Sequence, residues 1–164
     1  MTLLQDRPRL GFFVSHRGSN MRAIVEACRN GQLKADPTFL ISNNKNSGAL
    51  AWAVDNNLPH AHLSMKTTGS EEALDAAHVD VLRDADIDLV ILAGYMRKIG
   101  PKLIEAYPNR ILNIHPALLP KYGGKGMYGK NVHEAVIAGG DTESGVTVHL
   151  VDGGYDTGPT VAQK

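Results

Sequence analysis

The chain has 164 residues, of which 43% are hydrophobic and 21% are charged, a composition typical of one globular domain with a core of its own. Its formal net charge is zero, so no excess of charge favours nucleic acid or an anionic membrane surface as a partner. No apolar run approaches the roughly 20 residues of a membrane span, and because Cys28 is the only cysteine, no disulfide can form within the chain.

The chain starts with charged residues rather than with a targeting segment. The stretch MTLLQDRPRLGFFVS has no long apolar run and no small-residue cleavage site, so we expect no signal peptide. Cys28 lies in an apolar helical pattern, which favours a small core residue over a catalytic thiol. We therefore predict a reducing, cytoplasmic setting.

Short apolar runs and helical patterns alternate along the first half of the chain. The run at 9–15 predicts a strand, and the helical pattern that begins after residue 20 places four apolar residues on one face, namely Met21, Ile24, Val25 and Cys28. The next expected elements are a strand at 37–42, a helix at 46–57, a weaker strand at 60–64 and a helix at 70–85 with Ser70 as its N-cap.

The second half continues the alternation. The run DLVILAG at 88–94 is the clearest strand, and its continuous apolar character fits a strand covered on both faces. The remaining expected elements are a helix at 100–108 that starts near Pro101, a strand at 110–114, a helix at 131–140 and strands at 145–151 and 159–163. This pattern predicts an α/β fold in one domain over residues 1–164, with a doubly wound, mostly parallel sheet and helices on both faces.

Ligands of such folds bind beyond the carboxyl ends of the strands. Four polar or glycine-rich stretches follow predicted strands: SHRGSN at 15–20, GYMRK at 94–98, NIHP at 113–116 and DGGYDTGP at 152–159. If all these strands are parallel, the four stretches line one edge of the sheet, and we expect the functional site at that edge.

The first of these stretches opens directly onto a predicted helix. Backbone N–H groups and the positive end of the helix dipole at Gly18, Ser19 and Asn20 favour a bound phosphate, and His16 could help to hold the anion. The alternative is an ordinary helix-capping turn. Neither G-x-G-x-x-G nor G-x-x-x-x-G-K-[ST] occurs in the chain, which argues against a nucleotide-dependent dehydrogenase or an NTPase.

Asn113 and His115 are two residues apart in a predicted strand, so their side chains share a face. An amide and an imidazolium there can hold one carbonyl oxygen and transfer a proton. The alternative is that Asn113 contacts loop backbone and His115 packs in the core. An aspartate beside the imidazole would favour its charged form, and the spacing does not decide between Asp152 and Asp156.

Other site chemistries have little basis in the sequence. No group of His, Cys, Asp and Glu has the spacing of a metal site. Aromatic residues make up 5% of the chain and do not alternate with basic ones as in nucleic-acid-binding proteins. We expect small-molecule ligands, with no metal, nucleic-acid or membrane partner.

Together these motifs resemble the phosphoribosylglycinamide formyltransferase family, folate-dependent enzymes of de novo purine synthesis. The resemblance depends on GSN at 18–20, LAGYMRKIGP at 92–101, RILNIHPALLPKYGGKGMYG at 110–129 and GVTVHLVDGGYDTGP at 145–159. It implies a Rossmann-like formyltransferase fold and transfer of a formyl group to the primary amine of glycinamide ribonucleotide. The implied donor is 10-formyltetrahydrofolate, a co-substrate and not a tightly bound cofactor.

The resemblance also implies roles for individual residues. The family's catalytic Asn, His and Asp fall on Asn113, His115 and Asp156, which selects Asp156 over Asp152 by resemblance alone, and His149 is expected behind them. The substrate phosphate turn falls on residues 18–20. The residues implied to contact folate are Met96, Arg97, Lys98, Ile99, Asn113, Asp152, Gly153, Gly154, Tyr155 and Asp156.

Two departures from the family pattern keep alternatives open. The chain ends at GPTVAQK, whereas the family usually continues through a strand and a C-terminal helix that help to hold the substrate ribose. An arginine that some members use for folate falls near Glu71, so that contact is not predicted. The alternatives are a 10-formyltetrahydrofolate hydrolase with the same triad, or an inactive folate- or phosphate-binding fragment. We expect a monomer or a homodimer.

Overall fold

A seven-stranded mixed sheet forms the centre of the structure, a computed structural model that describes residue 4 and residues 6–164. Its strands are β1 Arg9–Val14, β2 Asp36–Ser42, β3 His60–His62, β4 Leu89–Leu92, β5 Ile111–His115, β6 Thr147–Leu150 and β7 Thr160–Gln163. They lie in the order β3-β2-β1-β4-β5-β6-β7. The neighbours from β3 to β5 are parallel, whereas β6 runs antiparallel to β5 and β7 antiparallel to β6.

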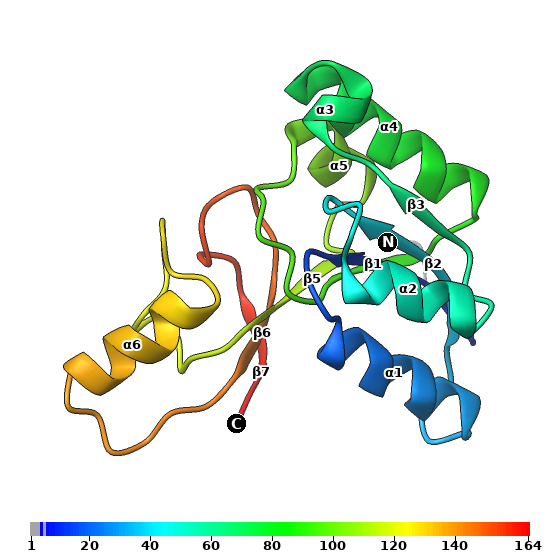
Figure 1. Cartoon of the computed structure of the whole chain (residues 1–164). Helices are drawn as coiled ribbons and strands as arrows, with labels where there is room; N and C mark the ends of the chain where they lie inside the picture. The colour runs from blue at the N-terminus through cyan, green and yellow to red at the C-terminus, as the bar shows by residue number, and fades with distance from the viewer. Residues whose placement is uncertain (1–3, 5) are drawn as a thin grey trace.

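Helices cover both faces of this sheet (Figure 1). One face carries α1 Ser19–Arg29 and α2 Gly48–Asp55, and the other carries α4 Glu71–Asp84 and α5 Pro101–Ala106. The short α3 Met65–Thr68 precedes α4, and α6 Lys130–Ala138 stands on the side of β6, apart from the other helices in Figure 1. The predicted doubly wound, mostly parallel α/β fold is confirmed.

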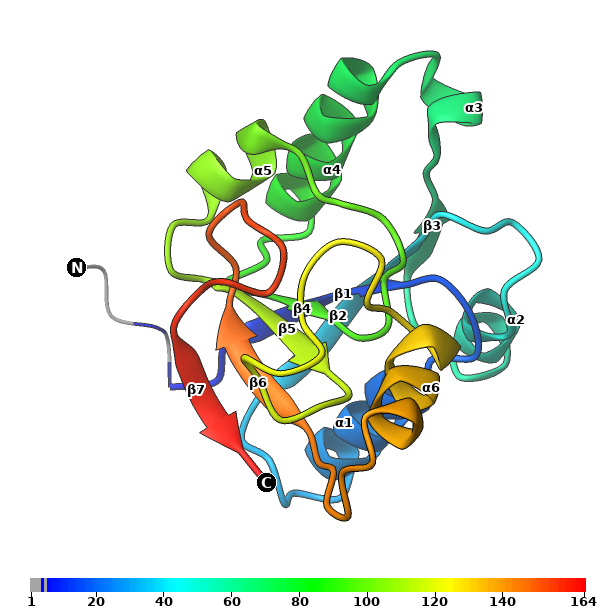
Figure 2. The same cartoon turned by 90° about the vertical axis from the view of Figure 1, so that its left-hand side faces the viewer.

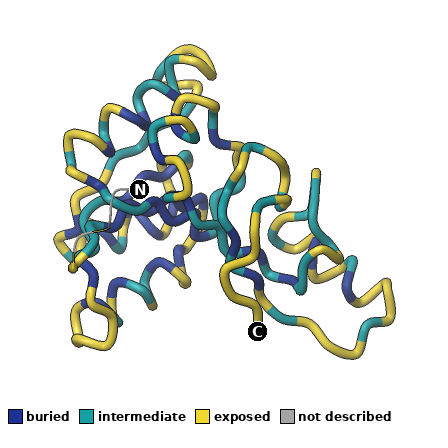
Figure 3. Tube along the Cα trace, turned by 180° about the vertical axis from the view of Figure 1, so that it is seen from behind, coloured by how far each residue is buried: buried dark blue, intermediate teal, exposed yellow. Residues whose placement is uncertain are grey.

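Neighbouring residues of β1 belong to two separate hydrophobic layers. Phe12 is fully buried in a cluster with Val25 of α1, whereas Phe13 is fully buried in a cluster with Leu82 of α4 and Leu103 of α5. Because side chains alternate between the faces of a strand, a strand covered on both faces has to be apolar throughout. Figure 3 shows the result, with buried central strands and an exposed β7.

Local caps explain where two helices begin. The Ser70 hydroxyl accepts a backbone N–H from the first turn of α4, as predicted. Asp75 of α4 caps a different helix, α5, because its carboxylate oxygens accept the N–H groups of Lys102 at 2.7 Å and of Leu103 at 3.0 Å. This contact fixes the segment after β4 against α4.

The pattern of the sequence does not predict α3. This helix has four residues, too few to show an apolar periodicity. It is held by a capping box in which Ser64 and Thr67 exchange side-chain and backbone hydrogen bonds.

The expectation that all four polar stretches follow strands at one edge of the sheet is wrong for the last stretch. Because β6 is antiparallel to β5, with Leu150 opposite Leu112, the carboxyl end of β6 lies at the opposite edge. The loop 151–159 then folds back along the sheet and brings Asp156 to Asn113. An alternating apolar pattern is the same in either strand direction, so the sequence could not predict this.

None of the described helices is long and apolar enough to cross a membrane. The prediction of no signal peptide rests partly on residues 1–3 and 5, which lie outside the described residues. Cys28 is buried in the apolar layer under α1, and this burial raises the pKa of its thiol, as expected of a core cysteine.

One buried side chain of α4 is polar. His78 is 2% exposed and packs edge-on against Phe13, with ring centroids 4.9 Å apart. Neither of its ring nitrogens has a hydrogen-bond partner among the described residues. Burial lowers the pKa of His78 to about 4, against a smaller opposing effect of Asp75.

This burial predicts a loss of stability in acid. The unfolded chain takes up a proton at His78 near the ordinary pKa of about 6.5, whereas the folded chain does so only at about 4. The free energy of unfolding therefore falls as the pH falls through this window, by roughly 3 kcal/mol at its lower end. The variant His78→Leu should lose this part of the slope in urea unfolding, and the exposed His133→Leu should keep it. The same slope in all three proteins would contradict the assignment.

Candidate active site

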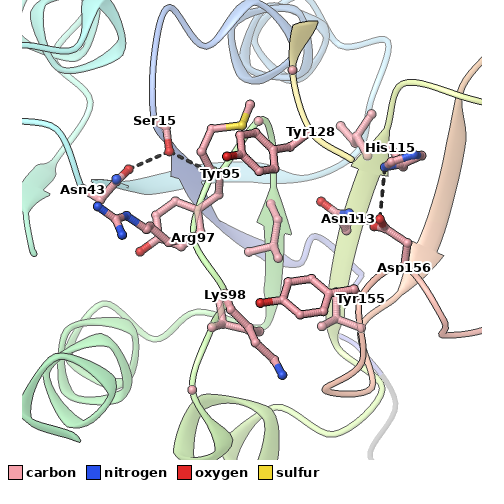
Figure 4. Close-up of a pocket in the computed structure, with 18 of the residues that line it drawn as sticks. Ser15, Asn43, Tyr95, Arg97, Lys98, Asn113, His115, Tyr128, Tyr155 and Asp156 are labelled. Carbon is pink, nitrogen blue, oxygen red and sulfur yellow. Dashed lines mark hydrogen bonds and ion pairs between the residues drawn. The ribbon is translucent and has the colours of Figure 1, made fainter. Parts of the chain in front are cut away.

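An open cleft of about 2630 Å³ lies at the carboxyl ends of β1, β4 and β5. The chain places β2 and β3 on one side of β1, and β4 and β5 on the other, and ligands of open α/β sheets bind at such a switch of strand order. All four predicted stretches line the cleft, through residues such as Asn20, Met96, His115 and Tyr155 (Figure 4).

The carboxylate of Asp156 lies among four partners, two at each oxygen. Oδ2 lies 3.4 Å from Nδ1 of His115 and accepts the backbone N–H of Gly124 at 3.1 Å. Oδ1 lies 3.4 Å from Nε2 of His149 and accepts the side-chain amide of Asn113 at 3.3 Å. The sequence predicted these side chains as one group, and the structure brings them together.

The strands explain this convergence. Asn113 and His115 lie on one face of β5, and His149 is directly opposite Asn113 in the antiparallel pairing with β6. Asp156 reaches them from the returning loop, with a left-handed backbone φ of 56°. Side chains directly opposite each other in a sheet are close neighbours, so the register of β5 and β6 sets the position of both His149 and Asn113.

Asp156 is ionised although it is largely buried. Burial is the largest single influence and would raise the pKa of its carboxyl group. The hydrogen bonds from His149 and Gly124 and the charge of His115 together outweigh burial, so the pKa lies below its ordinary value. The group at this position is therefore a carboxylate near neutral pH.

His149 is linked to both Asp156 and Asn113. Its Nδ1 donates to the Leu150 carbonyl at 3.0 Å, and its Nε2 lies 3.1 Å from the amide nitrogen of Asn113. The hydrogen bond with Asp156 raises the pKa of His149 by more than burial lowers it. When charged, His149 donates to Asp156 and no longer accepts from Asn113, which leaves an amide N–H for an oxygen in the cleft.

Each ring nitrogen of His115 faces an acceptor. Nε2 lies 2.8 Å from the backbone carbonyl oxygen of Tyr122, and Nδ1 faces Asp156. A carbonyl oxygen only accepts, so Nε2 bears a hydrogen and donates it. A substrate oxygen has to replace the Tyr122 carbonyl before it can receive this hydrogen bond.

Asp152, the alternative to Asp156, has a local role. Its Oδ1 accepts the N–H of Gly154 at 3.0 Å and the hydroxyl of Thr157 at 2.9 Å. The first of these hydrogen bonds is the largest cause of the lowered pKa of Asp152. Asp152 thus closes the turn that presents Tyr155 and Asp156, and it does not line the cleft, unlike its neighbours Gly153 and Gly154.

The proposed phosphate turn lies at one end of the site. Gly18 is the N-cap of α1 with a φ of 71°, and no side chain caps the first turn of the helix there. A Cβ at Gly18 would lie 3.1 Å from the Ala49 side chain, so glycine suits both the conformation and the close packing. Ser19 and Asn20 are exposed beside it and line an adjoining cavity with His16.

Two residues that the motifs did not include hold the segment at 96–99. The Ser15 hydroxyl accepts the backbone N–H of Met96 at 2.7 Å and donates to Oδ1 of Asn43 at 2.6 Å. In the same segment Arg97 and Lys98 are exposed, whereas Ile99 is buried in the core layer and lines the cleft as well. The signal for Ser15 and Asn43 is only their place directly after β1 and β2.

Comparison with known proteins gives this geometry a family. The sequence profile described as formyl transferase matches residues 8–164. The chain belongs to the formyl transferase family. Phosphoribosylglycinamide formyltransferase, chloroplastic, from Arabidopsis thaliana is 44% identical over 159 residues, which cover 96% of this chain and 54% of the relative. Phosphoribosylglycinamide formyltransferase from Haemophilus influenzae is 36% identical over 94% of this chain and 71% of the relative.

Solved structures of the family share the fold. Glycinamide ribonucleotide transformylase 1 from Symbiobacterium toebii has a TM-score of 0.91 at 34% identity, over 100% of this chain and 75% of that chain. A formyltetrahydrofolate deformylase from Pseudomonas syringae pv. tomato shares the fold, with a TM-score of 0.84 at 22% identity over 98% of this chain and 51% of that chain. This formyl transferase chain spans about half the length of the plant relatives it matches.

The contacts of Asp156 predict how His149 titrates. Because the hydrogen bond with Asp156 is the main cause of the raised pKa of His149, the variant Asp156→Asn should lower that pKa. NMR titration of the His149 ring protons measures it. Asp141→Asn, which removes a carboxylate paired with Lys121, should leave the titration unchanged. An unaltered His149 pKa in Asp156→Asn would show that the pairing is wrong.

Proposed function

We propose that this chain is a formyltransferase catalytic domain that transfers the formyl group of 10-formyltetrahydrofolate to the primary amine of glycinamide ribonucleotide. The observation that supports this most is the convergence of Asn113, His115 and Asp156 in one cleft. They lie between a turn suited to phosphate at Gly18 and the exposed segment that begins at Met96. The names of its relatives point to the same reaction.

In the proposed reaction the amine nitrogen attacks the formyl carbon, and the formyl oxygen becomes negative. The side-chain amide of Asn113 and Nε2 of His115 donate hydrogen bonds to that oxygen once the Tyr122 carbonyl has been displaced. The attacking nitrogen loses a proton, the folate nitrogen gains one, and the carbon–nitrogen bond to folate breaks. Asp156 holds His115 in place and favours its charged form.

The co-substrate and the setting follow from this proposal. The donor binds and leaves in each cycle, so no tightly bound cofactor is needed. The substrates are two small molecules, and the protein acts as a monomer or a homodimer. The cytoplasmic setting stays a prediction, since two plant relatives are described as chloroplastic.

The proposal predicts turnover of folate that depends on the amine. The protein is mixed with 10-formyltetrahydrofolate, with and without glycinamide ribonucleotide, and release of tetrahydrofolate is followed by absorbance. We expect release only when both substrates are present. Equal release without the amine would favour the hydrolase, the activity named for the deformylase of the same fold. Folate binding with no release would favour the inactive binding fragment.

A pair of matched variants links the activity to the site. His115→Asn should lower kcat by about 10² to 10⁴-fold, because a positioned acid and oxyanion donor is lost. His60→Asn makes the same exchange at an exposed position at the start of β3 and should leave kcat unchanged. Similar rates for both variants would contradict the role of His115.

A further inference from the structure

Lys98 and Tyr155 face each other across the cleft. The ammonium nitrogen of Lys98 lies 4.9 Å from the centre of the Tyr155 ring, and both residues line the cleft. They come from different walls, the segment after β4 and the loop after β6. Figure 4 shows that the side chain of Lys98 extends toward Tyr155, whereas that of Arg97 extends in another direction.

Among the described residues, Lys98 is a cation with no carboxylate partner. Four other lysines each pair with an acidic side chain, namely Lys34, Lys102, Lys121 and Lys130. The only contact found for the Lys98 ammonium is the Tyr155 ring. A ring attracts a cation but accepts no conventional hydrogen bond, so the N–H donors of Lys98 remain for an anionic ligand.

The surrounding charges make this cation selective in its position. Glu71 and Glu72 also line the cleft, and Glu72 pairs with Lys102 at 3.2 Å. A ligand with carboxylates is repelled by Glu71 and attracted by Lys98. The Tyr155 ring restricts where the ammonium can be, which reduces the loss of side-chain entropy when an anion binds.

We propose that Lys98, held over Tyr155, binds a carboxylate of the glutamate tail of the folate donor. This inference rests on the proposed function, in which 10-formyltetrahydrofolate occupies the cleft. Tyr155 directly precedes Asp156, so the lysine–tyrosine pair lies on the same two walls that flank the reacting centre. The folate glutamate carries two carboxylates, which makes it the anionic part of the donor.

The test removes the charge from the protein and from the ligand in turn. Binding of 5-formyltetrahydrofolate, a stable reduced folate, is compared by calorimetry with binding of its derivative in which both glutamate carboxylates are carboxamides. The proteins are the unaltered chain, Lys98→Met, Lys98→Arg and Lys66→Met. Lys66 also lines the cleft and loses the same charge, so Lys66→Met is the matched control.

We expect Lys98→Met to weaken binding of the folate about threefold to tenfold, the range of a partly exposed charge pair. Binding of the diamide should not change, and the loss for the folate should shrink as salt is added. Lys98→Arg should retain most of the affinity, and Lys66→Met all of it.

Three outcomes would overturn the inference. If the unaltered chain binds the diamide as tightly as the folate, the tail is not recognised by charge, although the proposed function stands. If Lys66→Met weakens folate binding more than Lys98→Met does, the wrong cation has been assigned. If the unaltered chain binds neither compound, the folate donor and this inference both fail.

Discussion

A buried carboxylate with four donors around it holds the candidate site together. The Asp156 side chain is 12% exposed, and a carboxylate in such a position is costly unless N–H groups or positive charges compensate it. The compensating groups lie on β5, on β6 and at Gly124 of the glycine-rich loop. One side chain therefore joins three segments, and it draws the loop 151–159 back from the far edge of the sheet. Without this interaction, His115 and Asn113 would have no common partner.

The opposite wall of the cleft is fixed by neutral hydrogen bonds. Ser15 links the ends of β1 and β2 to the segment at Met96, and Asp75 anchors the start of α5 beyond it. The two walls thus have different origins, one in a charged cluster and one in backbone N–H groups held by side chains. This division leaves the exposed Lys98 and Tyr155 side chains free to meet a ligand between rigid supports.

The elements that the sequence predicts well are those whose packing is one-dimensional. The run at 88–94 predicts β4 because a strand covered on both faces is apolar throughout, and Ser70 predicts the start of α4 because capping is local. The direction of β6, the single turn of α3 and the link from Ser15 to Asn43 depend on pairing between distant segments. The choice of Asp156 over Asp152 is of the same kind, since both lie in one loop and only its returning path separates them. Resemblance to a family supplied that choice before the contacts did.

The ionisation of Asp156 tests this account most directly. Labelling of aspartate carboxyl carbons with ¹³C, with Asp156→Asn to assign the signal, allows the titration to be followed by NMR. Because the donors around Asp156 outweigh burial and lower its pKa, the signal should stay that of an ionised carboxylate from pH 7 down to about pH 4.5, above the ordinary aspartate value of about 3.9. A titration of Asp156 within that range would contradict the account, since burial would then outweigh the donors.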